Sequence, residues 1–294
     1  MGYLYVKLTL SIYSHLTVLS SMQVISAKFI KLPVSVGMDY NADLQRIVAE
    51  IKRDIDALLV PALRAEQPNY VTDATWFDRL AAILRRIRER YESPQFRALA
   101  DVIARRFVNA VDMRVTKSMG MDVYGNNEAL QTVIEASIYD NVRLIKTIPE
   151  QYLSQVESIV VTNARAGVRS SAIASQLTQQ FGVTSRRAKF IARDQTAKVN
   201  SAVAQKRIVA AGYDYFEWRT SRDARVRDRH TQIANKMTEY GRGVYRYDNP
   251  PLSDKGEPIL PGTDFSCRCV QRPVSQREVD RNKERGLTAP GVKR

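Results

Sequence analysis

Histidine and cysteine are scarce in this chain, and most of them fall in one short C-terminal segment. The 294 residues include two histidines and two cysteines, and only His15 lies outside the stretch from His230 to Cys269. Cys267 and Cys269 are separated by one residue, so on a strand both thiols would project from the same face. With His230 beside them, they would supply three ligands of a tetrahedral zinc site.

Other interpretations of these residues stay open. Asp223, Asp228 or Asp264 could supply a fourth zinc ligand. Alternatively, the thiols could be reduced and packed, with the imidazole in a hydrogen-bond network, or they could serve transient redox chemistry. The spacing is not that of a zinc ribbon, which needs paired C-x-x-C motifs. A disulfide across one residue would be strained, which indicates a reducing, cytosolic origin.

A run of arginines precedes the histidine. The chain carries 45 Lys and Arg against 31 Asp and Glu, a formal charge of +14, so its electrostatic field attracts polyanions. Arginines in a short run can follow a phosphate backbone without reading its sequence. The alternative is a solvated run of local ion pairs. The residues predicted to contact nucleic acid are Arg219, Arg222, Arg225 and Arg229.

Five other residues of this segment are predicted to be structural. Asp223 and Arg227 are expected to form ion pairs with neighbouring charges and to stabilise a turn before the histidine. Trp218 lies in an aromatic, strand-like run and is expected in the core. Pro261 and Gly262 predict a rigid turn that positions the last strand.

Upstream of this segment, apolar residues recur at the three- and four-residue spacing of helices. The repeat from Leu44 to Leu58 is one example, and similar stripes follow. One helix is expected to begin near Pro149, a short one to end at Gly182, and a long one to end at Gly212. The first half of the chain is therefore predicted to be a helical bundle.

Aromatic and β-branched runs in the second half predict strands at residues 213–218, 244–247 and 267–271. The predicted fold class is α+β, mainly α. An N-terminal helical bundle is followed by a smaller C-terminal domain with a long helix and a small antiparallel sheet.

The ordered pattern W…R-D-x-R-V-R-x-x-H…P-P…P-G…C-R-C resembles the C-terminal signature of the phage Mu F-like minor head morphogenesis proteins. The resemblance extends upstream through Arg187-Ala188, the segment 191–196 and Asn200, and it covers roughly Val156 to Pro273. Similar proteins usually carry a glycine shortly after the histidine. Here Asn235 stands in that neighbourhood and can adopt the left-handed conformation instead.

The resemblance implies a minor capsid protein in the head of a tailed bacteriophage, assembled in the host cytoplasm. The implied partners are the portal protein, a scaffold or major capsid protein, and double-stranded DNA bound without sequence specificity. No enzymatic turnover and no membrane association are implied. The expected parts are an N-terminal extended arm (1–38), the helical bundle (39–148), the Mu F-like domain (149–275) and a mobile basic tail (276–294).

Two other classes of function remain open. A metal-dependent nuclease could use Asp223, Asp228 and His230, although such catalysis normally needs several acidic ligands around an open metal position. A free DNA-binding module is the second, although the chain has no recognition-helix or zinc-finger spacing.

Overall fold

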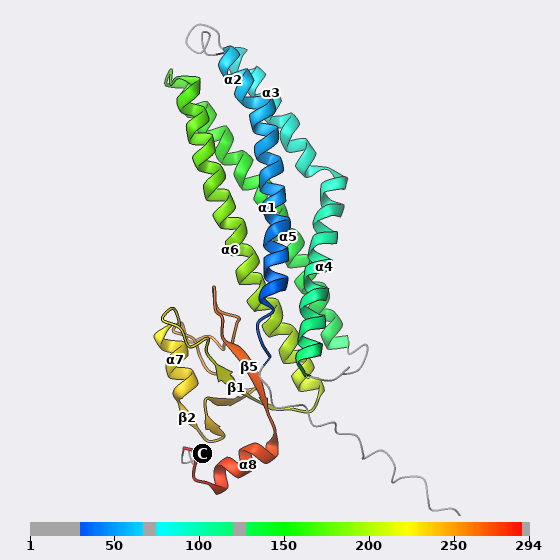
Figure 1. Cartoon of the computed structure of the whole chain (residues 1–294), viewed down its shortest axis with the longest axis vertical. Coiled ribbons are helices and arrows are strands. Elements are labelled where there is room, and N and C mark those ends of the chain that lie inside the picture. The colour runs from blue at the N-terminus through cyan, green and yellow to red at the C-terminus, as the bar shows by residue number, and fades with distance from the viewer. Residues whose placement is uncertain (1–29, 67–74, 120–127, 290–294) are drawn as a thin grey trace, which may run out of the picture.

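The computed structural model describes residues 30–66, 75–119 and 128–289. The expected N-terminal arm lies mostly outside these residues. Long helices form an elongated bundle, and a small sheet with two short helices lies against one end of it (Figure 1). The bundle elements are α1 (Val34–Asp54), the π-helical turn η1 (Ile55–Leu59), α2 (Val60–Glu66), α3 (Thr75–Glu92), α4 (Pro94–Met119), α5 (Glu128–Arg165) and α6 (Ser170–Ala210).

The bundle is held by apolar stripes at helical spacing. In α1, Leu44, Ile47 and Ile51 are buried on the face that packs toward α6 and α4. Polar bonds also cross the core, since the hydroxyl of Tyr40 donates to Asn141 Oδ1 at 2.9 Å. Burial of these stripes explains why the predicted helical bundle forms. Among the described helices, none combines the length and the apolar character that crossing a membrane requires.

Two predicted helix boundaries are wrong. Pro149 lies inside α5 and Gly182 lies inside α6, so each pair of expected helices is one continuous helix. Proline removes a helical hydrogen bond and glycine costs about 1 kcal/mol relative to alanine. Here the turns on both sides are anchored in the core, as Ile148 and Tyr152 show for α5. The expected boundary between residues 148 and 149 falls inside α5, and the division into domains stays a prediction.

The sheet has three antiparallel strands in the order β4-β1-β5. They are β1 (Tyr215–Arg219), β4 (Val244–Arg246) and β5 (Val270–Val274), and a separate two-stranded ribbon joins β2 (Met237–Thr238) to β3 (Gly241–Arg242). This confirms the predicted α+β, mainly α fold. The last strand begins at Val270, three residues later than predicted, because residues 267–269 form a loop.

Two short helices complete this part of the molecule, α7 (Asp228–Asn235) and α8 (Gln276–Glu284). The prediction that residues 276–289 form a mobile tail is wrong. The Ser275 hydroxyl caps α8 by accepting from the Glu278 amide, and Val279 is buried against the sheet. A single buried valine was too weak a periodic signal to predict a docked helix.

Candidate metal centre

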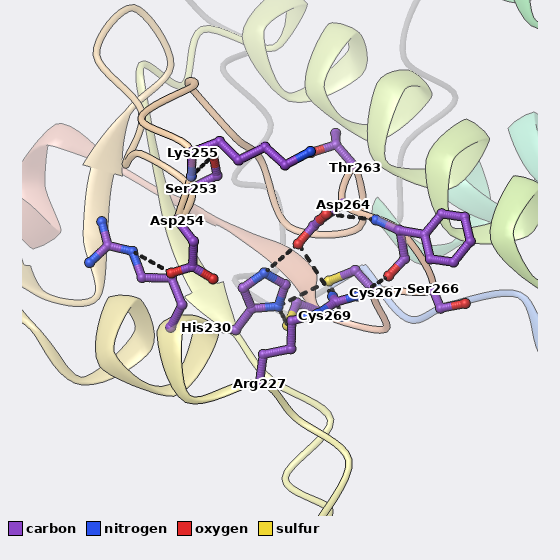
Figure 2. A network of polar contacts seen from close by, with 12 residues as sticks. Arg227, His230, Ser253, Asp254, Lys255, Thr263, Asp264, Ser266, Cys267 and Cys269 are labelled. Carbon is purple, nitrogen blue, oxygen red and sulfur yellow. Dashed lines mark hydrogen bonds and ion pairs between the residues drawn. The ribbon is translucent and has the colours of Figure 1, made fainter.

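The two cysteines and His230 come together from two elements at the edge of the sheet (Figure 2). His230 lies in the first turn of α7, whereas Cys267 and Cys269 lie in the loop before β5. All three side chains are buried, and their ligand atoms lie within 4.8 Å of one another. The structure thus assembles the predicted ligand set, although the thiols converge from a loop and not from one face of a strand.

The distances match those of a tetrahedral site. His230 Nδ1 lies 3.5 Å from Cys267 Sγ and 3.7 Å from Cys269 Sγ. Zinc bonds of ordinary length at tetrahedral angles place a nitrogen and a sulfur ligand about 3.6 Å apart. Both cysteines are free thiols, so their sulfur atoms are available as ligands. Both distances from the imidazole nitrogen to the thiols therefore suit a shared zinc ion.

The opposite ring nitrogen of His230 contacts a carboxylate. Asp264 Oδ2 lies 3.2 Å from His230 Nε2, and Arg227 Nη1 lies 3.3 Å from the same oxygen (Figure 2). Metal-bound histidines commonly bind a carboxylate through their second nitrogen, which fixes the ring orientation and raises its basicity. Asp264 therefore orients the imidazole, and the expectation that it could be a fourth ligand is not supported by its position.

The other two carboxylates considered as ligands also lie apart from the cluster. Asp223 forms a bidentate ion pair with Arg268, with one N···O distance of 2.6 Å. Asp228 is exposed at the first position of α7. Within the described residues, the group that could hold a metal contains three ligands, His230 and the two cysteines.

Hydrogen bonds within the cluster favour a thiolate in the metal-free protein. The pKa of Cys267 is lowered to about 4, first because Cys269 hydrogen-bonds to its sulfur and then because His230 does. The same thiolate, together with burial, raises the pKa of Cys269. The hydrogen bond to Cys267 raises the pKa of His230. The cluster therefore favours a thiolate at Cys267, and metal binding must displace the remaining protons.

Trp218 closes the inner side of the cluster. Its side chain is 1% exposed, and its ring centroid lies 5.2 Å from that of His230. Within the described structure, Trp218 Nε1 is buried and has no partner with full hydrogen-bond geometry, and its interaction with Cys269 only partly offsets the raised pKa of that thiol. A buried N–H in the same core as the thiols suits a negatively charged, metal-bound thiolate.

Helix α6 holds the cysteine loop in place. Asp194 is buried, and its Oδ1 accepts a hydrogen bond of 2.8 Å from the Ser266 amide. Ser266 has a φ of 53°, which a non-glycine residue rarely adopts, immediately before Cys267. Gln271 Nε2 donates to the Ser201 carbonyl at 3.1 Å, on the other side of the thiols. Sequence reasoning assigned no function to Asp194, although its segment, 191–196, was part of the family resemblance.

Gly262 allows the same loop to approach α6 closely. Its φ is +94°, and a Cβ atom added there would lie 3.0 Å from the Ala197 carbonyl oxygen. Pro261 beside it is buried. Both conditions favour glycine, and they explain the Pro-Gly turn in physical terms.

Gly262→Ala is expected to destabilise the protein by about 1–3 kcal/mol, because it adds a contact with α6 to an unfavourable backbone conformation. Gly256→Ala is the matched control, since Gly256 has a φ of +79° and nothing within 4 Å of the added Cβ. Urea denaturation of both variants measures the difference. Equal loss in the two variants would contradict a role for close contact with α6.

The predicted structural ion pairs bridge distant segments. Asp223 bonds to Arg268, 45 residues later, and Arg227 contacts Asp264 and the Phe265 carbonyl. These bonds connect the loop before α7 to the cysteine loop. Asp223 also contacts its sequence neighbour Arg225, whose backbone amide donates to Asp223 Oδ1 at 3.0 Å and whose guanidinium lies 3.9 Å away, as the predicted turn requires.

The four arginines predicted to contact nucleic acid are in different environments. Arg219 forms an ion pair of 2.7 Å with Glu217, and Arg229 donates to the Leu252 carbonyl. Arg222 and Arg225 are exposed on the loop between β1 and α7. Phosphate contact stays a prediction for all four, and the last two are the most accessible.

Comparison with known proteins agrees with the pattern at this site. The family model described as "Phage Mu protein F like protein" matches residues 154–272, from the second half of α5 into β5. A Haemophilus influenzae protein, described as an uncharacterized protein, is 30% identical over 262 residues. That match covers 84% of this chain and 55% of the relative, so the chain spans about half of the relative's length.

No solved structure matches the chain. The family match contains His230, Cys267 and Cys269. Its limits, residues 154 and 272, agree closely with the resemblance seen in the sequence from about Val156 to Pro273. Residues 154–272, with the candidate metal centre near their end, therefore match the phage Mu protein F-like family, which supports the resemblance seen in the sequence.

Proposed function

We propose that this chain is a minor head morphogenesis protein of a tailed bacteriophage. The observation that carries the proposal is the family match over residues 154–272, which includes the assembled His230, Cys267 and Cys269 cluster. In this proposal the protein is part of the virion, is recruited through the portal and a scaffold or major capsid protein, and lies close to packaged DNA.

Analysis of purified particles of the parent phage tests this proposal. Mass spectrometry is expected to detect the chain at low copy number in heads, and a tagged chain is expected to co-purify with the portal protein. Empty-vector lysate and an unrelated basic protein with the same tag are the controls. A chain that is absent from both the procapsids and the finished heads would contradict the proposal.

We also propose that the metal of the candidate centre is a structural zinc ion. The ligand set is soft, with two sulfur atoms and one imidazole nitrogen, which suits zinc. The zinc would connect α7 to the loop before β5 and stabilise a small sheet whose strands are only three to five residues long.

A structural role is favoured over nuclease activity because the acidic residues do not converge. Asp223 is bound to Arg268, and Asp264 contacts the histidine nitrogen that faces away from the thiols. Two-metal or magnesium-dependent cleavage needs carboxylates around an open metal position. Purified protein is expected to leave supercoiled plasmid intact in magnesium or manganese. Cleavage that disappears in His230→Ala would establish the enzymatic alternative.

Non-specific DNA binding through the exposed loop has its own test. Arg222→Gln with Arg225→Gln is expected to lower the slope of log affinity against log salt by about 2, because each phosphate contact releases about one counterion. Arg64→Gln with Arg86→Gln is the control, since these exposed arginines lie in α2 and α3 and carry the same charge. Fluorescence anisotropy with two unrelated duplexes measures the effect. An equal change in both double variants would indicate only a net-charge effect.

A further inference from the structure

A cavity of about 170 Å³ adjoins the three candidate metal ligands. His230, Cys267 and Cys269 all line it, so a metal bound by them would lie at its wall. The rest of the lining is strongly basic, and no aspartate or glutamate belongs to it within the described structure. The basic lining residues are Arg193, Arg225, Arg227 and Arg268.

Two of these four arginines, Arg193 and Arg225, keep a largely uncompensated charge. Arg227 and Arg268 are paired with the carboxylates of Asp264 and Asp223. Arg193 donates to the Ser266 hydroxyl at 3.1 Å and has no carboxylate partner among the ion pairs of the described residues. Arg225 is 76% exposed, and its closest carboxylate, at 3.9 Å, is already bound to Arg268.

A zinc ion held by these three residues would need a further ligand. Zinc in proteins takes four ligands, and the cluster supplies three. The nearby carboxylates are held in other contacts, as the positions of Asp264 and Asp223 show. All three ligand side chains line the cavity, so an anion bound in it would lie beside a metal held by them. An anion in the cavity would complete the coordination and neutralise the two free guanidinium groups.

We propose that this cavity binds a phosphate group, with one oxygen in the fourth position of the metal and the others on Arg193 and Arg225. The inference rests on the metal proposed above. The two guanidinium groups come from different elements, Arg193 from α6 and Arg225 from the loop before α7. That arrangement suits the oxygens of a tetrahedral anion better than those of a planar carboxylate.

Phosphate of this kind has two sources, free inorganic phosphate and the terminal phosphomonoester of a nucleic acid. Both present the same tetrahedral group with at least three unshared oxygens. They differ in size: inorganic phosphate would occupy the cavity alone, whereas the rest of a nucleic acid would have to extend out of the cavity along the loop before α7.

The test uses the full chain loaded with cobalt(II), whose visible absorption reports its ligands. Inorganic phosphate is expected to change the cobalt spectrum and to show paramagnetic broadening in its phosphorus NMR signal. Arg193→Gln with Arg225→Gln is expected to weaken phosphate binding by about tenfold or more, because both guanidinium groups would lose their bonds to the anion. Arg64→Gln with Arg86→Gln is the control and is expected to leave the affinity unchanged.

A second arm identifies the source. A short oligonucleotide with a 5′-phosphate and the same oligonucleotide without it are compared with inorganic phosphate. Tighter binding of the phosphorylated oligonucleotide supports the nucleic-acid end, whereas equal affinity for it and for inorganic phosphate supports the free anion.

The outcomes separate this inference from the one on which it rests. Cobalt bound with thiolate absorption but unaffected by phosphate overturns the phosphate site and leaves the metal site standing. No cobalt binding overturns the metal site and, with it, the proposed coordination. Phosphate that binds equally well with and without the metal also overturns the coordination.

Discussion

Replacing both thiols, by Cys267→Ser with Cys269→Ser, is expected to reduce bound zinc from one ion per chain to none. The expected loss of stability is about 4 kcal/mol where free zinc is a thousand times its dissociation constant, because the ion stabilises only the folded state. Plasma emission spectrometry measures the zinc, and thermal unfolding monitored by circular dichroism measures the stability. The loss should be confined to the part of the molecule around the small sheet.

Chelator-treated wild-type protein provides the control for this result. If the metal carries the stabilisation, removal of zinc should destabilise the wild-type chain as much as the double substitution does, and the chelator should leave the double variant unchanged. A metal-free chain of full stability would contradict the structural zinc. In that case the reduced, packed thiol cluster would be the correct interpretation.

Trp218→Ala is expected to destabilise the protein by about 3–5 kcal/mol, because it removes a large, fully buried side chain from the core of the small sheet. It should also weaken zinc binding, since the indole lies beside His230 and interacts with Cys269. Trp218→Phe keeps an aromatic ring but removes the N–H. It is therefore expected to cost less stability while still lowering the affinity for zinc.

The second tryptophan of the chain is a matched control. Trp76 is also buried, at 5% exposure, but it lies in α3 within the core of the helical bundle. Trp76→Ala is expected to lose a similar amount of stability without changing zinc affinity. Competition with a chromophoric chelator measures that affinity. Equal weakening of zinc binding by both tryptophan substitutions would mean that Trp218 acts through general stability and not through the thiolate.

The ligand set of the candidate metal centre could be predicted from the sequence because cysteine and histidine are rare and chemically distinctive. The residues that orient these ligands could not be predicted from the sequence. Asp264 was considered as a fourth ligand, yet it contacts the far nitrogen of His230, and only the orientation of the imidazole decides between these two positions. The thiols were assigned to a strand, whereas the bond from Ser266 to Asp194 holds them in a loop.

For the helices too, some features could be predicted from the sequence and others could not. Local periodicity predicted the apolar stripes and the bundle, because a helical face that is buried must repeat every three or four residues. The helix ends predicted at Pro149 and Gly182 were wrong. At both positions, long-range packing outweighs the intrinsic cost of proline or glycine in a helix, which is about 3 kcal/mol or less. Docking of α8 through Val279 was also invisible in the sequence, because its binding surface is formed by the sheet.

By itself, the sequence determined the α+β class, the resemblance to the phage family, the positive charge and the three side chains that could hold a metal. These depend on composition, periodicity and the order of rare residues, all of which are local properties of the chain. Only the tertiary structure decided which charges are neutralised and which remain exposed. Ion pairing and burial depend on segments far apart in the chain, as the pair of Asp223 and Arg268 shows. That pairing occupies the carboxylate nearest to Arg225, and Arg193 and Arg225 both line the cavity beside the metal ligands.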